Sequence, residues 1–213
     1  MKETIVEGYL TQQKLEEILK NEESLVFFER EFPVPGTKMH FDFVVGFKNS
    51  KTVFAVEFNG YQHYTDAKTV HRDARKHLIA EEQGFVLVNI PYFVQMTNES
   101  FAYYFGGRPV TDIVQNYPHG FIDKKAVLPA NFCEVGVDRF GTELFLLPDS
   151  IKNQVWNSLS DKIITNKMLP CTVFPVSLLS DQVCGIWKHL TTREEEEEPE
   201  LENPSYVEYL KSC

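Results

Sequence analysis

Two acidic residues interrupt or end apolar segments in the first half of the chain. Asp42 lies between Phe41 and Phe43, and Glu57 ends the apolar segment 52–56. Burying a carboxylate without a partner is costly, so such positions call for a counter-charge. Carboxylate oxygens a few ångströms apart are ligands that Mg²⁺ and Mn²⁺ accept. Asp42 and Glu57 therefore predict a divalent metal site.

The segment after Glu57 carries further polar side chains. The chain turns at Gly60, and this turn brings His63 back towards the predicted metal site. A histidine there can carry a proton or donate a hydrogen bond to phosphate. Asn59 and Gln62 lie in the same segment, and we predict that they bind substrate.

A third group of residues lies on a predicted helix further along the chain. Asp73 and Lys76 are three residues apart and therefore share one helix face, with Arg72 close by. This face can present an acid and two cations to a phosphodiester. We predict catalytic roles for Asp73 and Lys76 and substrate binding for Arg72.

Each of these residues also has an ordinary structural interpretation. Asp42 can be a solvated residue of an edge strand, Glu57 the polar end of a strand, and His63 a surface or core histidine. Asp73 and Lys76 can form a solvated helix pair that contributes little to stability. Their joint placement on one predicted framework favours a site over these separate interpretations.

That framework has the order helix, three strands, helix, strand. Apolar spacing predicts a helix over 11–20, strands over 25–30, 39–46 and 52–58, a helix over 69–83 and a strand over 85–90. A break near Asn49 joins the second and third strands as a hairpin, which places Asp42 beside Glu57. The sequence thus predicts an α/β (α+β) core with a mixed sheet over residues 1–95.

The second half of the chain is predicted to form a smaller α+β lobe over residues 96–190. Its expected elements are a helix over 99–105, a hairpin that pairs 132–137 with 142–147, a helix over 150–163 and a strand over 170–179. Residues 191–213 hold eight acidic and two basic side chains and have the composition of a solvated tail. The lobe is a candidate for DNA recognition or dimerisation.

Composition and charge limit the classes of protein to which the chain can belong. The chain has 213 residues, 43% apolar and 24% charged, which is typical of a folded globular protein. The net charge of −10 includes −6 from the tail, so it does not exclude a nucleic-acid partner. No apolar run approaches the ~18 residues of a membrane span, and we expect an intracellular protein without membrane contact. The four cysteines lack zinc-site spacing and are predicted to be reduced structural thiols.

The polar residues together resemble a known family. Asp42, the segment 57–63 (EFNGYQH), the segment 72–76 (RDARK), Gly84 and the apolar strand 86–92 resemble the Vsr-like branch of the PD-(D/E)XK nuclease superfamily. In that branch an Asp strand precedes an E-x-[DN]-G-x-x-H strand end and a D-x-x-K helix. The resemblance covers roughly residues 10–95.

The resemblance implies a restriction-endonuclease-like fold and Mg²⁺- or Mn²⁺-dependent hydrolysis of DNA phosphodiester bonds. It implies that Asp42 and Glu57 ligate the metal, that His63 acts as acid, base or phosphate contact, and that Asp73 and Lys76 complete the site. The superfamily's usual lysine two residues after the acid is Asn59 here. Asparagine carries no charge, so His63 or Lys76 must replace that lysine in an active enzyme.

Three functions remain open at this stage. The first is a metal-dependent DNA endonuclease, for which a homodimer is one of the oligomeric states considered. The second is a catalytically inactive nuclease-fold module for DNA binding or assembly, and the third is an adaptor that uses the acidic tail. The sequence also leaves open whether Glu31, or Glu16 and Glu17, adds a carboxylate to the metal site. Residues of the second half that can contact DNA if exposed are Tyr103, Tyr104, Arg108, Lys124, Lys125 and Arg139.

Overall fold

A computed structural model of the chain describes residues 8–34, 36–48, 50–120 and 131–166, with side chains described as far as residue 159. The chain divides into two compact units. The first comprises Met1–Tyr61 and Arg72–Lys125, and the second comprises Gln62–His71 and Ala126–Cys213. Each unit is described by itself below. Within the described residues, no helix is long and apolar enough to cross a membrane.

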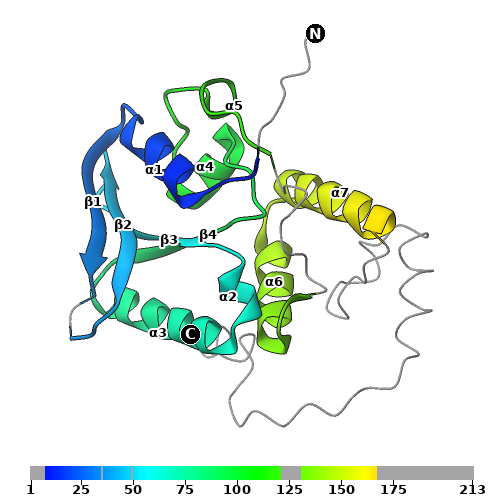
Figure 1. Cartoon of the computed structure of the whole chain (residues 1–213). Helices are drawn as coiled ribbons and strands as arrows, with labels where there is room; N and C mark the ends of the chain where they lie inside the picture. Colours follow the sequence, from blue (N-terminus) through cyan, green and yellow to red (C-terminus); the bar gives the residue numbers. More distant parts are fainter. Residues whose placement is uncertain (1–7, 35, 49, 121–130, 167–213) are drawn as a thin grey trace. The chain divides into compact units, whose positions relative to one another are not determined.

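The first unit is built on a mixed sheet of four strands, drawn in Figure 1. Their order in the sheet is that of the chain: β1 (Leu25–Pro33), β2 (His40–Phe47), β3 (Val53–Asn59) and β4 (Val86–Pro91). The first three strands are antiparallel, and β4 runs parallel to β3. The predicted α and β content and the mixed sheet are confirmed, and β3 is an inner strand as its apolar sequence predicts.

Helices cover both faces of this sheet (Figure 1). On one face, α1 (Gln12–Lys20) and α4 (Asn98–Phe105) join a core cluster with alternate residues of the strands, among them Val45, Val56 and Val88. On the other face, Ala80 of α3 (Ala67–Glu82) packs with Val44 and Ala55. The short helix α5 (Ile113–Asn116) buries Ile113 in the first cluster.

Local signals in the sequence explain where these helices begin and end. The Thr11 side chain accepts a hydrogen bond from the Lys14 backbone N–H at 3.1 Å, which is the N-cap that the sequence predicts for α1. Gly106 ends α4 in the left-handed conformation, at φ 72°. The predicted helices over 11–20 and 99–105 are therefore confirmed to within a residue.

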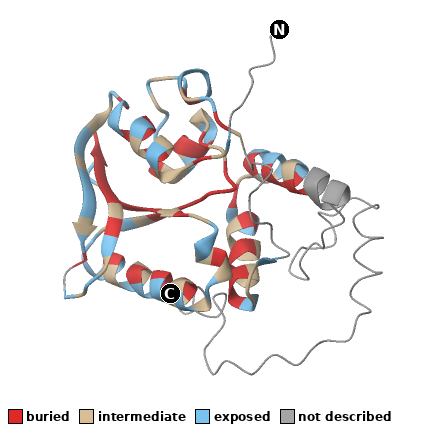
Figure 2. Cartoon of the chain, in the orientation of Figure 1, coloured by how far each residue is buried: buried red, intermediate tan, exposed pale blue. Residues whose placement is uncertain are grey.

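The strand β1 lies at one edge of the sheet and is largely exposed, as its tan and blue colours in Figure 2 show. Its Glu31 has a φ of 51°, the left-handed region that a residue with a side chain rarely adopts. The neighbouring Arg30 forms ion pairs with Glu31 at 3.7 Å and with Glu16 at 3.4 Å. The outer strand thus combines charged side chains with a break in its regular backbone.

The described part of the second unit is helical. It contains α2 (Gln62–Thr65), the start of α3, α6 (Glu134–Leu146) and α7 (Asp149–Asn166). The predicted hairpin of 132–137 with 142–147 is wrong, because α6 spans most of it. Val135, Phe140 and Leu144 are buried on one side of this helix, a spacing that suits a helix as well as strands. The predicted helix over 150–163 is confirmed, whereas the strand predicted over 170–179 lies outside the described residues.

A polar and aromatic network fastens α2 to α6. The Tyr64 hydroxyl donates to Glu143, and the Tyr64 ring stacks on Phe132 with centroids 5.0 Å apart. Arg139 binds Glu143 at 2.8 Å and donates to the His63 carbonyl oxygen at 3.3 Å. Arg139 is fully buried, so its predicted place among exposed DNA contacts is wrong. Arginine is usually exposed, which is why the sequence suggested that Arg139 is exposed. The ion pair with Glu143, one helical turn away, makes the burial of Arg139 tolerable.

The close approach of α2 to α6 depends on Gly136. A Cβ atom added there would lie 1.8 Å from the Tyr64 carbonyl oxygen, which no adjustment of a side chain can relieve. We therefore expect Gly136→Ala to destabilise the chain by about 1–3 kcal/mol or more in urea unfolding. Gly107→Ala is the matched control, because a Cβ there meets nothing within 4 Å. Equal stability of the two variants would contradict the described packing.

Candidate active site

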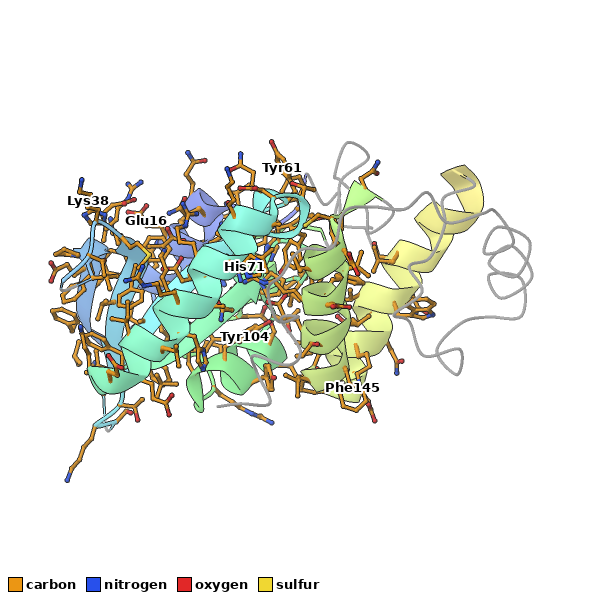
Figure 3. All side chains as sticks on the ribbon, turned by 90° about the horizontal axis from the view of Figure 1, so that it is seen from below. Glu16, Lys38, Tyr61, His71, Tyr104 and Phe145 are labelled. Atoms are coloured by element: carbon orange, nitrogen blue, oxygen red, sulfur yellow. The ribbon has the colours of Figure 1, made fainter. Side chains whose placement is uncertain are left out.

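A cluster of charged side chains, three of them buried and Asp42 half-buried, lies between the sheet and α3 in the first unit. Its members are Asp42 on β2, Glu57 on β3, and Asp73 and Lys76 on α3. Figure 3 shows α3 crossing in front of the sheet on this side. The structure therefore brings together four residues that the sequence singles out.

Strand register explains how Asp42 and Glu57 meet. In the antiparallel pair of β2 and β3, Phe43 lies opposite Val56, so the next positions along the strands are Asp42 and Glu57. Opposite residues of an antiparallel pair direct their side chains to the same face. The Asp42 carboxylate also accepts a hydrogen bond from the Phe58 backbone N–H at 2.7 Å, which holds it at the end of this pairing.

Lys76 supplies the only positive charge that the described residues place against Glu57. Its Nζ lies 2.8 Å from both carboxylate oxygens of Glu57. Both residues are buried, with 7% of Lys76 and 2% of Glu57 exposed. Removing either partner of this buried pair would leave a polar or charged group in the interior without its partner, which is destabilising.

The cluster carries more negative than positive charge. Burial raises the pKa of Glu57 to about 8, nearby Asp42 and Asp73 also raise it, and Lys76 opposes these effects. Asp73, one turn before Lys76 on α3, is itself only 6% exposed. Three carboxyl groups thus face one lysine, and ionisation of all three leaves an excess of two negative charges.

This donor set fits a hard divalent cation. The described residues contain no group of three acidic, histidine or cysteine side chains that could hold a metal ion, and Asp42 and Glu57 are an adjoining pair of carboxylates. Mg²⁺ is commonly held by one or two carboxylates, with water and substrate phosphate as its other ligands. Two adjoining carboxylates with excess negative charge meet that description.

Asn59 lies two residues beyond Glu57 on β3 and therefore on the same face of the sheet. Its Nδ2 donates to the Asn89 Oδ1 on β4 at 3.3 Å. Its Oδ1 is buried and has no hydrogen-bond partner among the described residues. Asn89 lies opposite Glu57 in the parallel pair of β3 and β4. Asn89 is not among the residues predicted from the sequence, although a polar residue inside the apolar segment 86–90 is a signal for it.

The other predicted residues are Arg72, Gln62 and His63. Arg72 is on α3 and exposed, in contrast to Asp73 beside it. Gln62 and His63 belong to the second unit, where α2 carries them and the network of Arg139 holds the His63 carbonyl. Gln62 is exposed and His63 is half-buried.

The sequence left open whether Glu16, Glu17 or Glu31 is a further metal ligand. In the structure each of these three acids forms an ion pair with a lysine or an arginine. Glu16 pairs with Lys20 at 2.6 Å, Glu17 with Lys14 at 2.8 Å, and Glu31 with Arg30. Tyr103 and Arg108 are exposed and Tyr104 is half-buried, all in the first unit, whereas Lys124 and Lys125 lie outside the described residues. Cys133 is a free thiol, and the other three cysteines also lie outside them.

Comparisons of the chain with protein-family models, with curated proteins and with solved structures found no significant match. The resemblance to the Vsr-like nucleases therefore rests on the sequence motif alone.

The raised pKa of Glu57 predicts a pH-dependent stability. The folded chain keeps a proton on Glu57 that the unfolded chain releases, so this residue's contribution to the free energy of unfolding falls as the pH rises from about 4.5 to about 8. Glu57→Gln removes the ionisation. In urea unfolding with EDTA, we expect the stability of the parent to fall relative to this variant across that range. Glu17→Gln, an exposed control, should follow the parent. A pH-independent difference between parent and Glu57→Gln would refute the assignment.

Proposed function

We propose that the chain is a metal-dependent DNA endonuclease that hydrolyses phosphodiester bonds. The observation that carries the proposal is the charged cluster in which Glu57 lies opposite Asp42 and binds Lys76 through both oxygens. A strand acid paired across the sheet with a second acid, and held by a lysine, suits the chemistry of a metal-assisted hydrolase. The motif resemblance supplies DNA as the expected substrate.

Asp42 and Glu57 would hold the ion, which we expect to be Mg²⁺ or Mn²⁺. When bound, such an ion polarises the phosphate and lowers the pKa of an attacking water. The Glu57 carboxylate must lose its proton before it can act as a ligand, and the adjacent Lys76 ammonium favours that loss. Metal binding and proton release by Glu57 are therefore linked in this proposal.

Lys76 is our candidate for the positive charge that the superfamily places two residues after the acid. Its ammonium reaches Glu57 from α3, whereas the strand position itself holds the neutral Asn59. Asn59 keeps a buried oxygen without a partner among the described residues, and that oxygen can accept a hydrogen bond from water or substrate. We propose Asp73 as a second acid of the site and His63 as a proton carrier. Gln62 and Arg72, both exposed, are proposed substrate contacts.

One observation favours a second function. The ammonium of Lys76 occupies both oxygens of Glu57, which is also how an inactive nuclease-fold DNA-binding or assembly module would neutralise a buried acid. Calorimetric titration with Mn²⁺ distinguishes the two functions. The endonuclease requires binding that Glu57→Gln weakens, and the inactive module predicts no such binding.

Replacement of Asp42 provides the direct test of the metal ligand. Asp42→Asn keeps the side-chain volume and removes the charge, so we expect cleavage of supercoiled plasmid with Mg²⁺ to fall on the order of 100-fold or more. Mn²⁺ affinity should fall in parallel. The control Glu17→Gln changes an exposed, paired acid and should cleave as the parent does. Unimpaired cleavage by a folded Asp42→Asn variant would exclude Asp42 as a ligand.

We expect substitutions of Arg72 and Lys76 to affect different quantities, the DNA affinity for Arg72 and the cleavage rate for Lys76. Arg72 is exposed on α3, so Arg72→Ala should weaken DNA binding and lower the salt slope by about one phosphate contact. Lys76 is buried against Glu57, so Lys76→Met should reduce the cleavage rate far more than the DNA affinity. Affinities are measured by fluorescence anisotropy with Ca²⁺, and rates in a cleavage assay with Mg²⁺. If Lys76→Met lost DNA affinity and Arg72→Ala kept it, these roles would be reversed.

A further inference from the structure

A second cavity lies in the first unit, away from the charged cluster. It has a volume of about 570 Å³ and is lined at the start of β3 by Thr52 and Phe54. Glu57 and Asn59 lie towards the other end of β3, and five residues of strand span roughly 16 Å between Phe54 and Asn59. Phe54 also belongs to the core cluster of α1 and α4, on the face opposite α3. The cavity is therefore a separate site at the other end and on the other face of the sheet.

Phenylalanine rings form the apolar wall of this cavity. Phe47, Phe54, Phe101 and Phe105 all line it, and each is less than a tenth exposed. The rings contact one another, with centroids 4.7 Å apart for Phe101 and Phe105 and 5.2 Å for Phe47 and Phe105. Such interlocked rings have few alternative rotamers, so the wall is rigid, and it offers apolar and aromatic contacts to a flat ring.

The rim of the cavity is basic and polar. Lys48 and Arg108 both line it and are exposed, and no carboxylate in the described part of the chain pairs with either. Ser50 and Thr52 lie on the same lining, and so does Ser24, whose hydroxyl donates to Glu22. Two cations without a carboxylate partner among the described residues are suited to an anion, and Arg108 can bind phosphate through two N–H groups.

A buried carboxylate holds two sides of the rim together. Glu22 is only 5% exposed, and its oxygens accept hydrogen bonds from the Val110 backbone N–H at 3.1 Å. One of them also accepts from the Ser24 backbone N–H at 3.2 Å and from the Ser24 hydroxyl at 2.7 Å. These bonds fix the segment that carries Arg108 against the turn that carries Ser24. The cavity is thus supported by a buried polar contact that closes a loop of 88 residues.

We propose that this cavity binds a nucleoside phosphate. The base lies against the phenylalanine wall, and the phosphate lies at Lys48 and Arg108. The volume is within the range of small-molecule sites, and the combination of an aromatic wall with two cations at the rim matches a ring that carries a phosphate. The same chemistry can come from a free nucleotide or from one nucleotide of a single strand. This inference does not depend on the proposed endonuclease activity.

Binding to the full chain tests the proposal, with EDTA present so that no divalent ion takes part. AMP, GMP, CMP and UMP are titrated by calorimetry, followed by inorganic phosphate, phosphotyrosine and a short single-stranded oligodeoxynucleotide. We expect Arg108→Ala and Lys48→Ala each to weaken nucleotide binding about tenfold, as expected for loss of a charge-assisted contact. Lys38→Ala removes an exposed lysine outside the cavity, marked in Figure 3, and should bind as the parent does.

The results separate the proposal from its competitors. Monophosphates that bind through Lys48 and Arg108 support it. An oligonucleotide that binds more tightly, with the same dependence on these residues, identifies a strand as the source. Phosphate that binds as tightly as AMP shows that the wall contributes nothing and overturns the proposal. Binding of phosphotyrosine with none of the nucleotides overturns it too, as does nucleotide binding that Arg108→Ala leaves unchanged. Circular dichroism confirms folding of each variant, whose changes are confined to exposed side chains.

Discussion

The ion pair between Glu57 and Lys76 is the interaction on which the first unit most depends. Glu57 lies on an inner strand and is almost completely buried, where a lone carboxylate is unfavourable by several kcal/mol. Lys76 compensates it from α3 through two contacts of 2.8 Å. The pair therefore fixes which turn of α3 faces the end of β3. Apolar contacts such as Ala80 against Ala55 permit that docking, and the charges give it one position along the helix.

The pair also makes the environment of Glu57 on β3 depend on the position of α3. A lysine on β3 would be rigidly attached to the strand that carries Glu57, whereas Lys76 depends on the docking of α3. Any shift of that helix moves Lys76 away from Glu57. The Glu57 carboxyl group then remains beside Asp42 without the opposing positive charge. Packing of the helix and ionisation of the acid are consequently parts of one equilibrium. The opposite face of the sheet packs through interlocked phenylalanine rings.

Much of the first unit follows from local patterns. The spacing of Leu15, Ile18 and Leu19 with the Thr11 cap specifies α1, and the apolar segment ending at Glu57 specifies an inner strand. The meeting of Asp42 and Glu57 was predictable because a hairpin sets its own register. The contact of Lys76 with Glu57 was not, since helical periodicity places Lys76 on a face but does not say what that face covers.

The second unit shows why such patterns fail. Gly136 and Gly141 favour strands with breaks over a helix, yet Gly136 is needed where the Tyr64 carbonyl approaches α6. Arg139 similarly depends on Glu143 and Tyr64, and its partner Tyr64 is distant in the sequence. Both are tertiary requirements that no short window of sequence contains. Asn89 was missed for a related reason, because its significance comes from lying opposite Glu57 on a parallel neighbour.

The left-handed backbone at Glu31 has a consequence for how copies of this chain can associate. An edge strand with regular backbone offers a row of free N–H and C=O groups to which a foreign strand can add. At Glu31 the backbone departs from the extended conformation, and Glu29 and Arg30 place charges beside it. A strand added along β1 would have to follow this local change of backbone. The positive φ at Glu31 and the neighbouring charges therefore disfavour strand addition at this edge.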